Sequence, residues 1–253
     1  MIDVHCHLEQ KDYDNDRDEV INELKKNLKA VITSCAHPKN FDLTMRLIEK
    51  YKGFVFGAFS IHPIYVKEFP SEEREKYFNL LRENRDKIVA IGETGLDYYW
   101  IKEDEWKEEQ KKLFVEMINL SKELNKPLVI HARESYEDCI DILEMEGAEK
   151  VDLHMFGGRK LLDRVIRNGW YISMNAILLR SKNHKKIIRD MPLDRIMLET
   201  DSPWLNPNGG RNTPLTIKVV AEKIAEIKKI EFEEVWTTCG ESAVKFFNLP
   251  INL

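Results

Sequence analysis

Short apolar segments alternate with longer amphipathic segments along the whole chain. Eight apolar segments rich in β-branched residues predict strands, at Met1–Val4, Ala30–Ser34, Phe54–Phe59, Ile88–Ile91, Leu128–Ile130, Val151–Leu153, Trp170–Met174 and Arg195–Leu198. Between them, apolar residues recur at three- and four-residue spacing, as in Val20, Leu24 and Leu28, and this spacing predicts amphipathic helices. The last two predicted helices are Thr216–Lys229 and Phe232–Phe247.

The predicted strands are apolar on both faces and alternate with helices, which indicates a parallel sheet covered on both sides. Eight strand–helix units in 253 residues match the size of a (β/α)₈ TIM-like barrel. We therefore expect one α/β domain over residues 1–253. A doubly wound open sheet is the alternative fold, but a glycine-rich phosphate loop does not follow the first predicted strand.

Composition and charge restrict the class of protein. Hydrophobic residues make up 43% and charged residues 33%, and the formal net charge is −5, so the sequence predicts a globular protein and disfavours one that coats DNA. The four cysteines are widely separated, which predicts reduced thiols rather than disulfides. The first residues do not resemble a signal peptide, and apolar runs are too short to span a membrane. These features predict a cytoplasmic protein with no membrane association and no obligate protein partner.

Residues able to bind a metal ion lie on or directly after five of the predicted strands. They are His5, His7, Glu93, His131, His154 and Asp201. His5 and His7 are two residues apart and therefore share one face of an extended chain. Any one of the six has an ordinary explanation as a hydrogen-bonded residue at a strand end. The carboxyl ends of barrel strands meet at one mouth, however, so the full set predicts one metal-binding site there.

The number of these residues indicates two ions. A catalytic zinc ion takes three protein ligands, six are available, and a carboxylate can bridge two ions. Four imidazoles and two carboxylates suit Zn²⁺ or Mn²⁺, whereas Mg²⁺ is usually bound by oxygen ligands. We therefore predict two divalent metal ions per chain, with Zn²⁺, Mn²⁺ and Mg²⁺ as candidates.

Six motifs resemble those of the TatD metal-dependent deoxyribonucleases, a branch of the amidohydrolase superfamily. They are DVHCHL at Asp3–Leu8, SIHP at Ser60–Pro63, IGETGLDY at Ile91–Tyr98, VIHAR at Val129–Arg133, LHMFGG at Leu153–Gly158 and LETDSP at Leu198–Pro203. The resemblance extends to Arg211–Asn212 and so covers most of the chain. It implies a TIM-like barrel that hydrolyses phosphodiester bonds in DNA, often from the 3′ end.

The resemblance also implies how the ligands are shared. His5, His7, Glu93 and Asp201 would bind one ion, and Glu93, His131 and His154 the other, so that Glu93 bridges. Two loops depart from the usual family pattern. The family's HCFSG is His154–Gly158 (HMFGG) here, and the family's RNEP is Arg211–Pro214 (RNTP). Both changes leave the predicted ligands intact and lie in loops expected to face substrate.

Several further residues are candidates for contact with DNA. His62 and Arg133 resemble family positions that approach phosphate, although a structural hydrogen bond explains them equally well. Arg211, on the Asn206–Asn212 loop, is the stronger phosphate candidate because a guanidinium can bind two phosphate oxygens. Trp204 and Tyr98 are candidates for stacking on bases, or for packing.

Two residues beside the first histidines have simpler expected roles. Cys6 should point away from the ligands and pack. Asp3 either faces away as well or hydrogen-bonds one of the histidines.

We therefore predict a metal-dependent hydrolase acting on DNA phosphodiester bonds through a metal-activated water. Asp201 is the predicted general base and later proton donor, and Glu93 the predicted bridge between the ions. Two other classes remain open. One is an amidohydrolase that acts on a small amide, ester or lactone with the same metals. The other is a non-catalytic module, which would have no use for six converging ligands.

Overall fold

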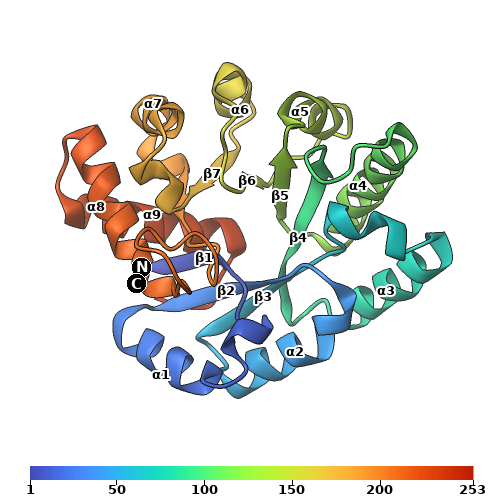
Figure 1. The fold of residues 1–253 in the computed structure, drawn as a ribbon, viewed down its shortest axis with the longest axis horizontal. Coiled ribbons are helices and arrows are strands. Elements are labelled where there is room, and N and C mark those ends of the chain that lie inside the picture. The colour runs from blue at the N-terminus through green and yellow to red at the C-terminus, as the bar shows by residue number, and fades with distance from the viewer. Residues whose placement is uncertain (253) are drawn as a thin grey trace.

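The computed structural model describes residues 1–252 and contains one sheet of eight parallel strands, ordered along the sheet as they are along the chain (Figure 1). The strands are β1 Ile2–Cys6, β2 Ala30–Cys35, β3 Val55–Phe59, β4 Ile88–Asp97, β5 Leu128–Arg133, β6 Val151–Leu153, β7 Tyr171–Met174 and β8 Ile196–Leu198. All eight predicted strands are therefore present, and the TIM-like barrel is confirmed.

The sheet curves so that its first and last strands come together. Directly after β8, the amide groups of Thr200 and Asp201 donate hydrogen bonds to the carbonyl of His5, at 3.3 and 2.9 Å. The amide of His7 in turn donates to the carbonyl of Ser202 at 2.7 Å. These bonds nearly close the barrel at the end where the strands finish.

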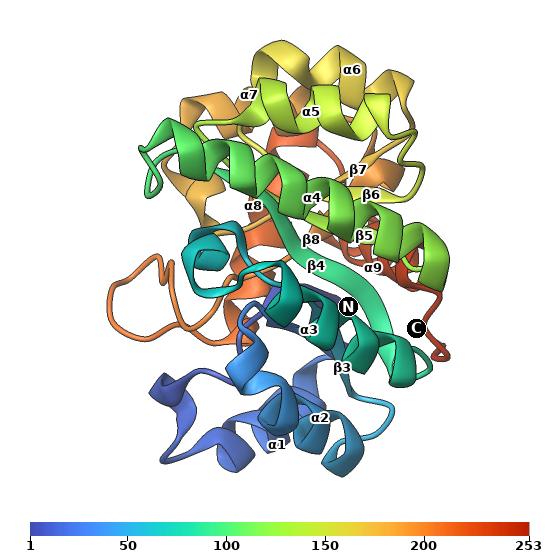
Figure 2. The ribbon, with the colours of Figure 1, turned by 90° about the vertical axis from the view of Figure 1, so that its right-hand side faces the viewer.

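Nine α-helices within residues 1–252 accompany the strands, most of them in a ring around the barrel (Figures 1 and 2). They are α1 Arg17–Asn27, α2 Phe41–Lys50, α3 Ser71–Glu83, α4 Asp104–Leu124, α5 Tyr136–Met145, α6 Leu162–Arg167, α7 Lys182–Asp190, α8 Ile217–Lys228 and α9 Phe232–Phe247. α9 has the predicted bounds, and α8 is one residue shorter at each end than the helix predicted there.

Apolar side chains form two separate cores. The larger core lies between the strands and the helices and includes Cys6 and Ile91. The smaller core fills the barrel with side chains such as Ile2 and Val129, together with Phe246 and nearby apolar side chains from α9. The lower barrel is therefore packed with apolar groups, and polar side chains are left to the carboxyl ends of the strands.

β4 is longer than predicted because the apolar pattern that defined the predicted strand ends before polar residues that still belong to the sheet. The prediction ended at Ile91, but β4 continues to Asp97 and pairs with β5 over this extension. Gly95 has a φ of +136°, and a Cβ there would lie 2.1 Å from the carbonyl oxygen of His131. Glycine is thus required where β4 passes this close to β5.

Within residues 1–252, no helix combines the length and the apolar character needed to cross a membrane.

Candidate metal centre

A β-bulge in β1 turns the two first histidines into the barrel. Ile2 and Val4 belong to the inner core, and simple alternation would then point His5 and His7 outward. The pairing of β1 with β2 shifts register between Asp3 and Cys6, which adds one residue to β1. This extra residue reverses the alternation, so both imidazoles face the mouth of the barrel and Cys6 packs outward.

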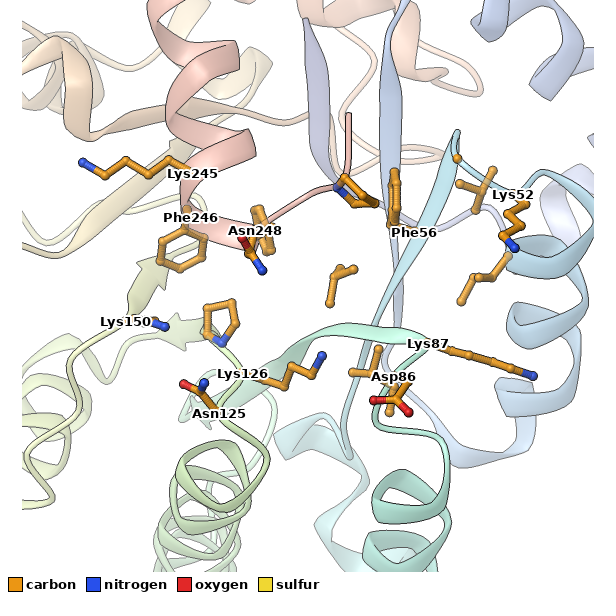
Figure 3. Close-up of a pocket in the computed structure, with 18 of the residues that line it drawn as sticks. Lys52, Phe56, Asp86, Lys87, Asn125, Lys126, Lys150, Lys245, Phe246 and Asn248 are labelled. Carbon is orange, nitrogen blue, oxygen red and sulfur yellow. The ribbon is translucent and has the colours of Figure 1, made fainter. Parts of the chain in front are cut away.

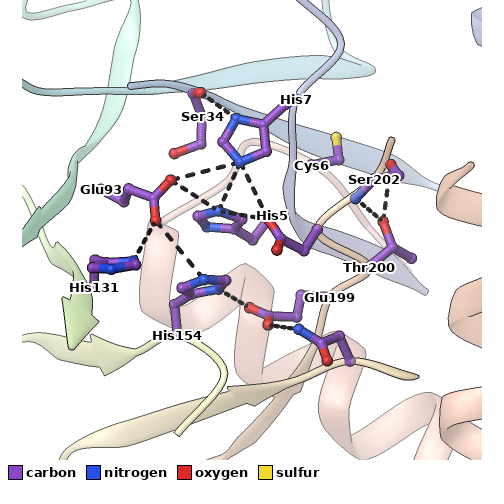
Figure 4. Close-up of polar contacts among 12 residues, drawn as sticks. His5, Cys6, His7, Ser34, Glu93, His131, His154, Glu199, Thr200 and Ser202 are labelled. Atoms are coloured by element: carbon purple, nitrogen blue, oxygen red, sulfur yellow. Dashed lines mark hydrogen bonds and ion pairs between the residues drawn. The ribbon is translucent and has the colours of Figure 1, made fainter. Parts of the chain in front are cut away.

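A second bulge acts in the same way on Glu93. In β4, Ala90 belongs to the inner core and Ile91 to the outer core. The register against β5 shifts between Ile91 and Thr94, where two residues of β4 occupy the space of one. Glu93 lies within this irregularity and points toward the histidines, as Figure 4 shows. Glu93 therefore lies inside a strand, whereas the sequence predicted a position at a strand end.

The remaining predicted ligands come from the other side of the barrel. His131 lies in β5, His154 directly follows β6, and Asp201 lies three residues beyond β8. Asp201 has a φ of +56°, in the left-handed region, while its amide is bonded to His5. All six predicted ligands are thus brought to one end of the barrel.

The first group of ligand atoms lies around one oxygen of Glu93. His5 Nε2 and His7 Nε2 are 3.2 Å apart, and they lie 3.5 and 3.6 Å from Glu93 Oε1. Asp201 Oδ1 is 3.7 Å from His5 Nε2 and 3.3 Å from His7 Nε2. Bonds of about 2.0 to 2.2 Å to a tetrahedral ion separate neighbouring donors by roughly 3.3 to 3.6 Å. His5, His7 and Glu93 are therefore close enough together to hold a single divalent ion, and Asp201 approaches both imidazoles.

The second group lies around the other oxygen of Glu93. His131 Nδ1 is 3.2 Å and His154 Nε2 is 3.8 Å from Glu93 Oε2 (Figure 4). His62 Nε2 also lies 3.5 Å from this oxygen, so a residue predicted to contact substrate joins the ligand cluster. Because each Glu93 oxygen faces a different set of imidazoles, its carboxylate has the arrangement of a bridge.

Hydrogen bonds on the far side of three imidazole rings leave one nitrogen of each ring free for a metal ion. His7 Nδ1 donates to the carbonyl of Ser34 at 2.9 Å. His154 Nδ1 donates to Glu199 Oε2 at 2.9 Å, and His131 Nε2 donates to Asp97 Oδ2 at 2.9 Å. In a neutral imidazole the opposite nitrogen then carries a lone pair, and in all three rings this nitrogen faces Glu93.

Asp97 and Glu199 were missed as functional residues from the sequence. Glu199 is buried and also accepts hydrogen bonds from Ser173 and Asn175, at 2.6 and 2.8 Å. Both acids stand in motifs noted above, IGETGLDY and LETDSP, but their contacts with histidines depend on neighbouring strands. Glu199 directly follows the predicted strand Arg195–Leu198, and that position was its only available signal. Asp97 lies six residues beyond the predicted end of the fourth strand and had no such signal.

The charges of the cluster reinforce one another. Burial alone would raise the pKa of Glu93, but the nearby imidazoles of His62, His5 and His131 hold it well below the usual range. Burial would likewise lower the pKa of His154, but Glu199 and Glu93 raise it to about 10. In the ion-free protein the imidazole of His154 therefore holds an extra proton, which a metal ion would replace.

The other candidate residues lie outside this cluster. Asp3 accepts hydrogen bonds from the amides of His5 and Thr200, both at 3.1 Å, so it fastens β1 to the segment after β8 rather than orienting an imidazole ring. Tyr98 donates its hydroxyl to Asp138 at 2.7 Å. Trp204 is 46% exposed, and its ring centre lies 4.8 Å from that of His7, at the mouth.

The two candidate arginines differ in their partners. Arg211 forms a two-pronged ion pair with Asp16, at 2.5 and 2.7 Å, and lies over the ring of Tyr13. Arg133 ends β5, is exposed, and stacks on the ring of Tyr99 at 4.0 Å. A phosphate would have to displace Asp16 from Arg211, so the structure favours Arg133 over Arg211 as a phosphate contact.

A large cavity lies at the opposite end of the barrel and does not include the candidate ligands. It measures about 1030 Å³ and is lined by the first residues of β3 and β4, by residues that precede β3 to β6, and by the end of α9 and the residues after it. Lys52, Lys126 and Phe246 are among these residues (Figure 3). Active sites of TIM barrels lie at the carboxyl ends of the strands, so the cavity is separate from the candidate metal centre.

Comparisons with known proteins agree with the fold and show a family. A family model described as TatD related DNase matches residues 2–248. Deoxyribonuclease TATDN3 of Homo sapiens is 36% identical over 260 residues, covering 98% of this chain and 94% of the human protein. The uncharacterized metal-dependent hydrolase YabD of Bacillus subtilis is 36% identical over 259 residues, covering 98% and 99%.

A solved structure shares the same architecture. The TatD homolog YJJV from Escherichia coli K12 superimposes with a TM-score of 0.90 and is 24% identical, covering 99% of this chain and 98% of that one. At this level of identity the likeness supports the barrel fold.

Proposed function

Because the chain belongs to the TatD family of related DNases, we propose that it hydrolyses phosphodiester bonds of DNA at the histidine–carboxylate cluster. The chain is a metal-dependent hydrolase by its family. The observation that carries the proposal is the Glu93 carboxylate, whose two oxygens each face a separate set of imidazole nitrogens.

We assign His5, His7, Glu93 and Asp201 to one divalent ion, and Glu93, His131 and His154 to a second. The far-side hydrogen bonds of three imidazoles support this assignment, since they direct lone pairs toward Glu93. Zn²⁺, Mn²⁺ and Mg²⁺ remain the candidate ions. Ions bound here would act as Lewis acids and lower the pKa of water to about 7.

Asp201 is the proposed general base and proton donor. Its side chain is 17% exposed, more than Glu93 at 6%, so it is the carboxylate of the cluster that water reaches most easily. Burial would raise the pKa of Asp201, but His7 and its other imidazole neighbours hold it below the ordinary value. Asp201 is therefore ionised near neutral pH and able to accept a proton from an attacking water.

Residues that contact DNA form a separate part of the proposal. His62 is placed beside Glu93, where it can donate a hydrogen bond to a phosphate oxygen. Arg133 and Arg211 are the candidate guanidinium contacts, and the free guanidinium of Arg133 makes it the stronger of the two. Digestion from the 3′ end and a cytoplasmic location stay predictions.

The test uses purified protein loaded in turn with Zn²⁺, Mn²⁺ and Mg²⁺. Single-stranded DNA labelled at either end, bis-p-nitrophenyl phosphate and p-nitrophenyl acetate are offered as substrates. We expect both phosphodiesters to be hydrolysed, and Asp201→Asn to lower both rates by about 10²- to 10⁴-fold. Hydrolysis of the carboxylic ester with both phosphodiesters intact would instead support the small-molecule amidohydrolase.

A further inference from the structure

Two aromatic side chains at the end of β4 are exposed at the mouth of the barrel. Tyr99 is 41% and Trp100 63% exposed, and their rings form an edge-to-face pair with centres 4.9 Å apart. Burying such a ring is ordinarily favourable, so an exposed pair of this size indicates a surface that binds something. Figure 2 shows the loop from β4 to α4 at the same end of the barrel as the loop after β8.

Positive charge surrounds this aromatic pair. The Arg133 guanidinium lies 4.0 Å from the centre of the Tyr99 ring and 5.7 Å from that of Trp100. Lys102 Nζ also lies 5.3 Å from the centre of the Tyr99 ring. Within residues 1–252, Lys102 has a carboxylate partner in Glu134, at 3.3 Å, and Arg133 has none in ion-pair range. The surface therefore offers flat aromatic faces beside an uncompensated cation.

This surface is joined to the candidate metal centre through Asp97. One Asp97 oxygen accepts a hydrogen bond from the amide of Trp100 at 2.8 Å, and the other accepts from His131 Nε2 at 2.9 Å. Asp97 also pairs with Arg133 across β4 and β5. Arg133 lies two residues beyond His131 on the same strand face, so it is displaced by about 7 Å toward the mouth.

We propose that Tyr99, Trp100 and Arg133 form a binding site for single-stranded DNA, in which the aromatic rings stack on unpaired bases and Arg133 binds a neighbouring phosphate. This inference rests on the proposed function. Unpaired bases are the occupant favoured by the chemistry, because they expose flat faces and carry a phosphate at each step. In a duplex the faces of the bases are covered by their neighbours.

Trp204 is another exposed aromatic residue, beside the set of ligands that contains His7. Its exposed ring lies beside His7, whereas Trp100 is connected to His131. An exposed tryptophan thus lies beside His7, and a second is linked through its backbone amide and Asp97 to His131, on loops from different strands. A single strand crossing the cluster would meet an aromatic face on either side of the reacting phosphate.

The experiment compares a long substrate with a short one. For Trp100→Ala, we expect KM for a single-stranded oligonucleotide to rise about 5- to 150-fold with a much smaller change in kcat, the range typical of one lost stacking contact. The ratio of kcat/KM for the oligonucleotide to that for bis-p-nitrophenyl phosphate should fall by the same factor. Trp100→Phe should restore most of the loss, and Met145→Ala, at an exposed position on α5, serves as the control.

Other outcomes separate the explanations. Equal losses on both substrates would overturn the proposal, because they would show that the Trp100 side chain affects the metal centre itself rather than the binding of bases. An unchanged KM for the oligonucleotide would also overturn it. A change from dimer to monomer in Trp100→Ala on gel filtration would show that a second copy of the chain covers the surface.

A direct binding measurement keeps this inference distinct from the proposed function. The anisotropy of a fluorescein-labelled single-stranded oligonucleotide reports binding without any turnover. If wild-type protein binds it through Trp100 but cleaves no phosphodiester, the proposed hydrolysis fails and the binding site stands. If wild-type protein cleaves DNA and Trp100→Ala binds equally well, the binding site fails and the proposed function stands.

Discussion

The Glu93 carboxylate is buried with histidine nitrogens around both of its oxygens. If divalent ions bind on either side, its negative charge reduces the repulsion between them. Glu93→Gln keeps the size of the side chain and removes this charge. We expect the variant to lose both metal content and activity, because both depend on the same carboxylate.

Elemental analysis after loading with metal ions and desalting measures the loss of metal content. Glu103→Gln is the matched control, since Glu103 is exposed and pairs with Lys67 rather than with a histidine. Full metal content in Glu93→Gln, equal to that of the control, would rule out Glu93 as the bridge.

Glu199 affects the site through His154. Its carboxylate accepts the Nδ1 proton of that imidazole, which fixes the orientation of the ring and makes Nε2 more basic. We expect Glu199→Gln to weaken metal binding by about 10- to 100-fold, as is typical for such partners of metal ligands. Competition with a chelator of known affinity measures the change.

Asp152 provides the control for this substitution. Its carboxyl lies 2.9 Å from the Ser173 hydroxyl, and burial and the charge of Glu199 raise its pKa to about 8, so it is protonated near neutral pH. Asn resembles a protonated Asp in shape and charge, and Asp152→Asn should leave metal affinity close to that of wild type. If the two variants lose affinity equally, the Glu199 effect arises from general disturbance of the core.

At the level of single elements, the sequence predicted where strands occur better than where they end. Apolar content located all eight strands, and the His5–His7 spacing correctly placed both imidazoles on one face. The bulges that turn His5, His7 and Glu93 inward were not predictable, because a bulge is defined by the register of a strand against its partner. The contact between Glu199 and His154 likewise depends on strands brought together by folding.

The junction between β1 and β8 depends on Asp3. This buried carboxyl accepts hydrogen bonds from the amides of His5 and Thr200 and from the Thr200 hydroxyl, the last at 2.6 Å. Asp3→Ala removes the acceptor that these donors share, at about 1–3 kcal/mol for each group left unsatisfied. The Thr200 amide and hydroxyl keep longer bonds, to the carbonyl of His5 at 3.3 Å and the hydroxyl of Ser202 at 3.1 Å. We expect the free energy of unfolding to fall by about 3 kcal/mol, which denaturation in urea would measure.

Asp3→Asn is a smaller change at the same junction between β1 and β8. Its amide oxygen still accepts a hydrogen bond, so the loss of stability should be smaller than in Asp3→Ala. Loss of less than about 0.5 kcal/mol in Asp3→Ala would mean that the junction is held by the backbone bonds of His5 and His7 alone.

Across the whole molecule, stability and chemistry occupy opposite ends of the barrel. Apolar side chains from the strands and α9 fill the lower interior, while buried histidines and carboxylates gather at the mouth. The charged groups at the mouth contribute little apolar packing, and several imidazoles there hold protons when no ion is bound. Metal binding is therefore expected to add to the stability of the folded chain.

The last prediction concerns the number of ions and their effect on stability. We expect elemental analysis to give two divalent ions per loaded chain, and His131→Ala to retain about one, because His5, His7 and Asp201 are left intact. At a free concentration one hundred times its Kd, each ion adds about 2.7 kcal/mol to the free energy of unfolding, which corresponds to a rise in Tm of roughly 5–10 °C for a chain of this size.

The same rise in Tm should depend on pH. Burial lowers and Glu199 raises the pKa of His154, with a net increase to about 10, so an ion must displace a proton there. Protons compete more strongly as the pH falls, and the rise in Tm should therefore be smaller at about pH 6 than at about pH 8.5. A wild-type protein that holds one ion at saturation, with the same rise in Tm at both pH values, would contradict the paired site and leave Glu93 as an ordinary ligand.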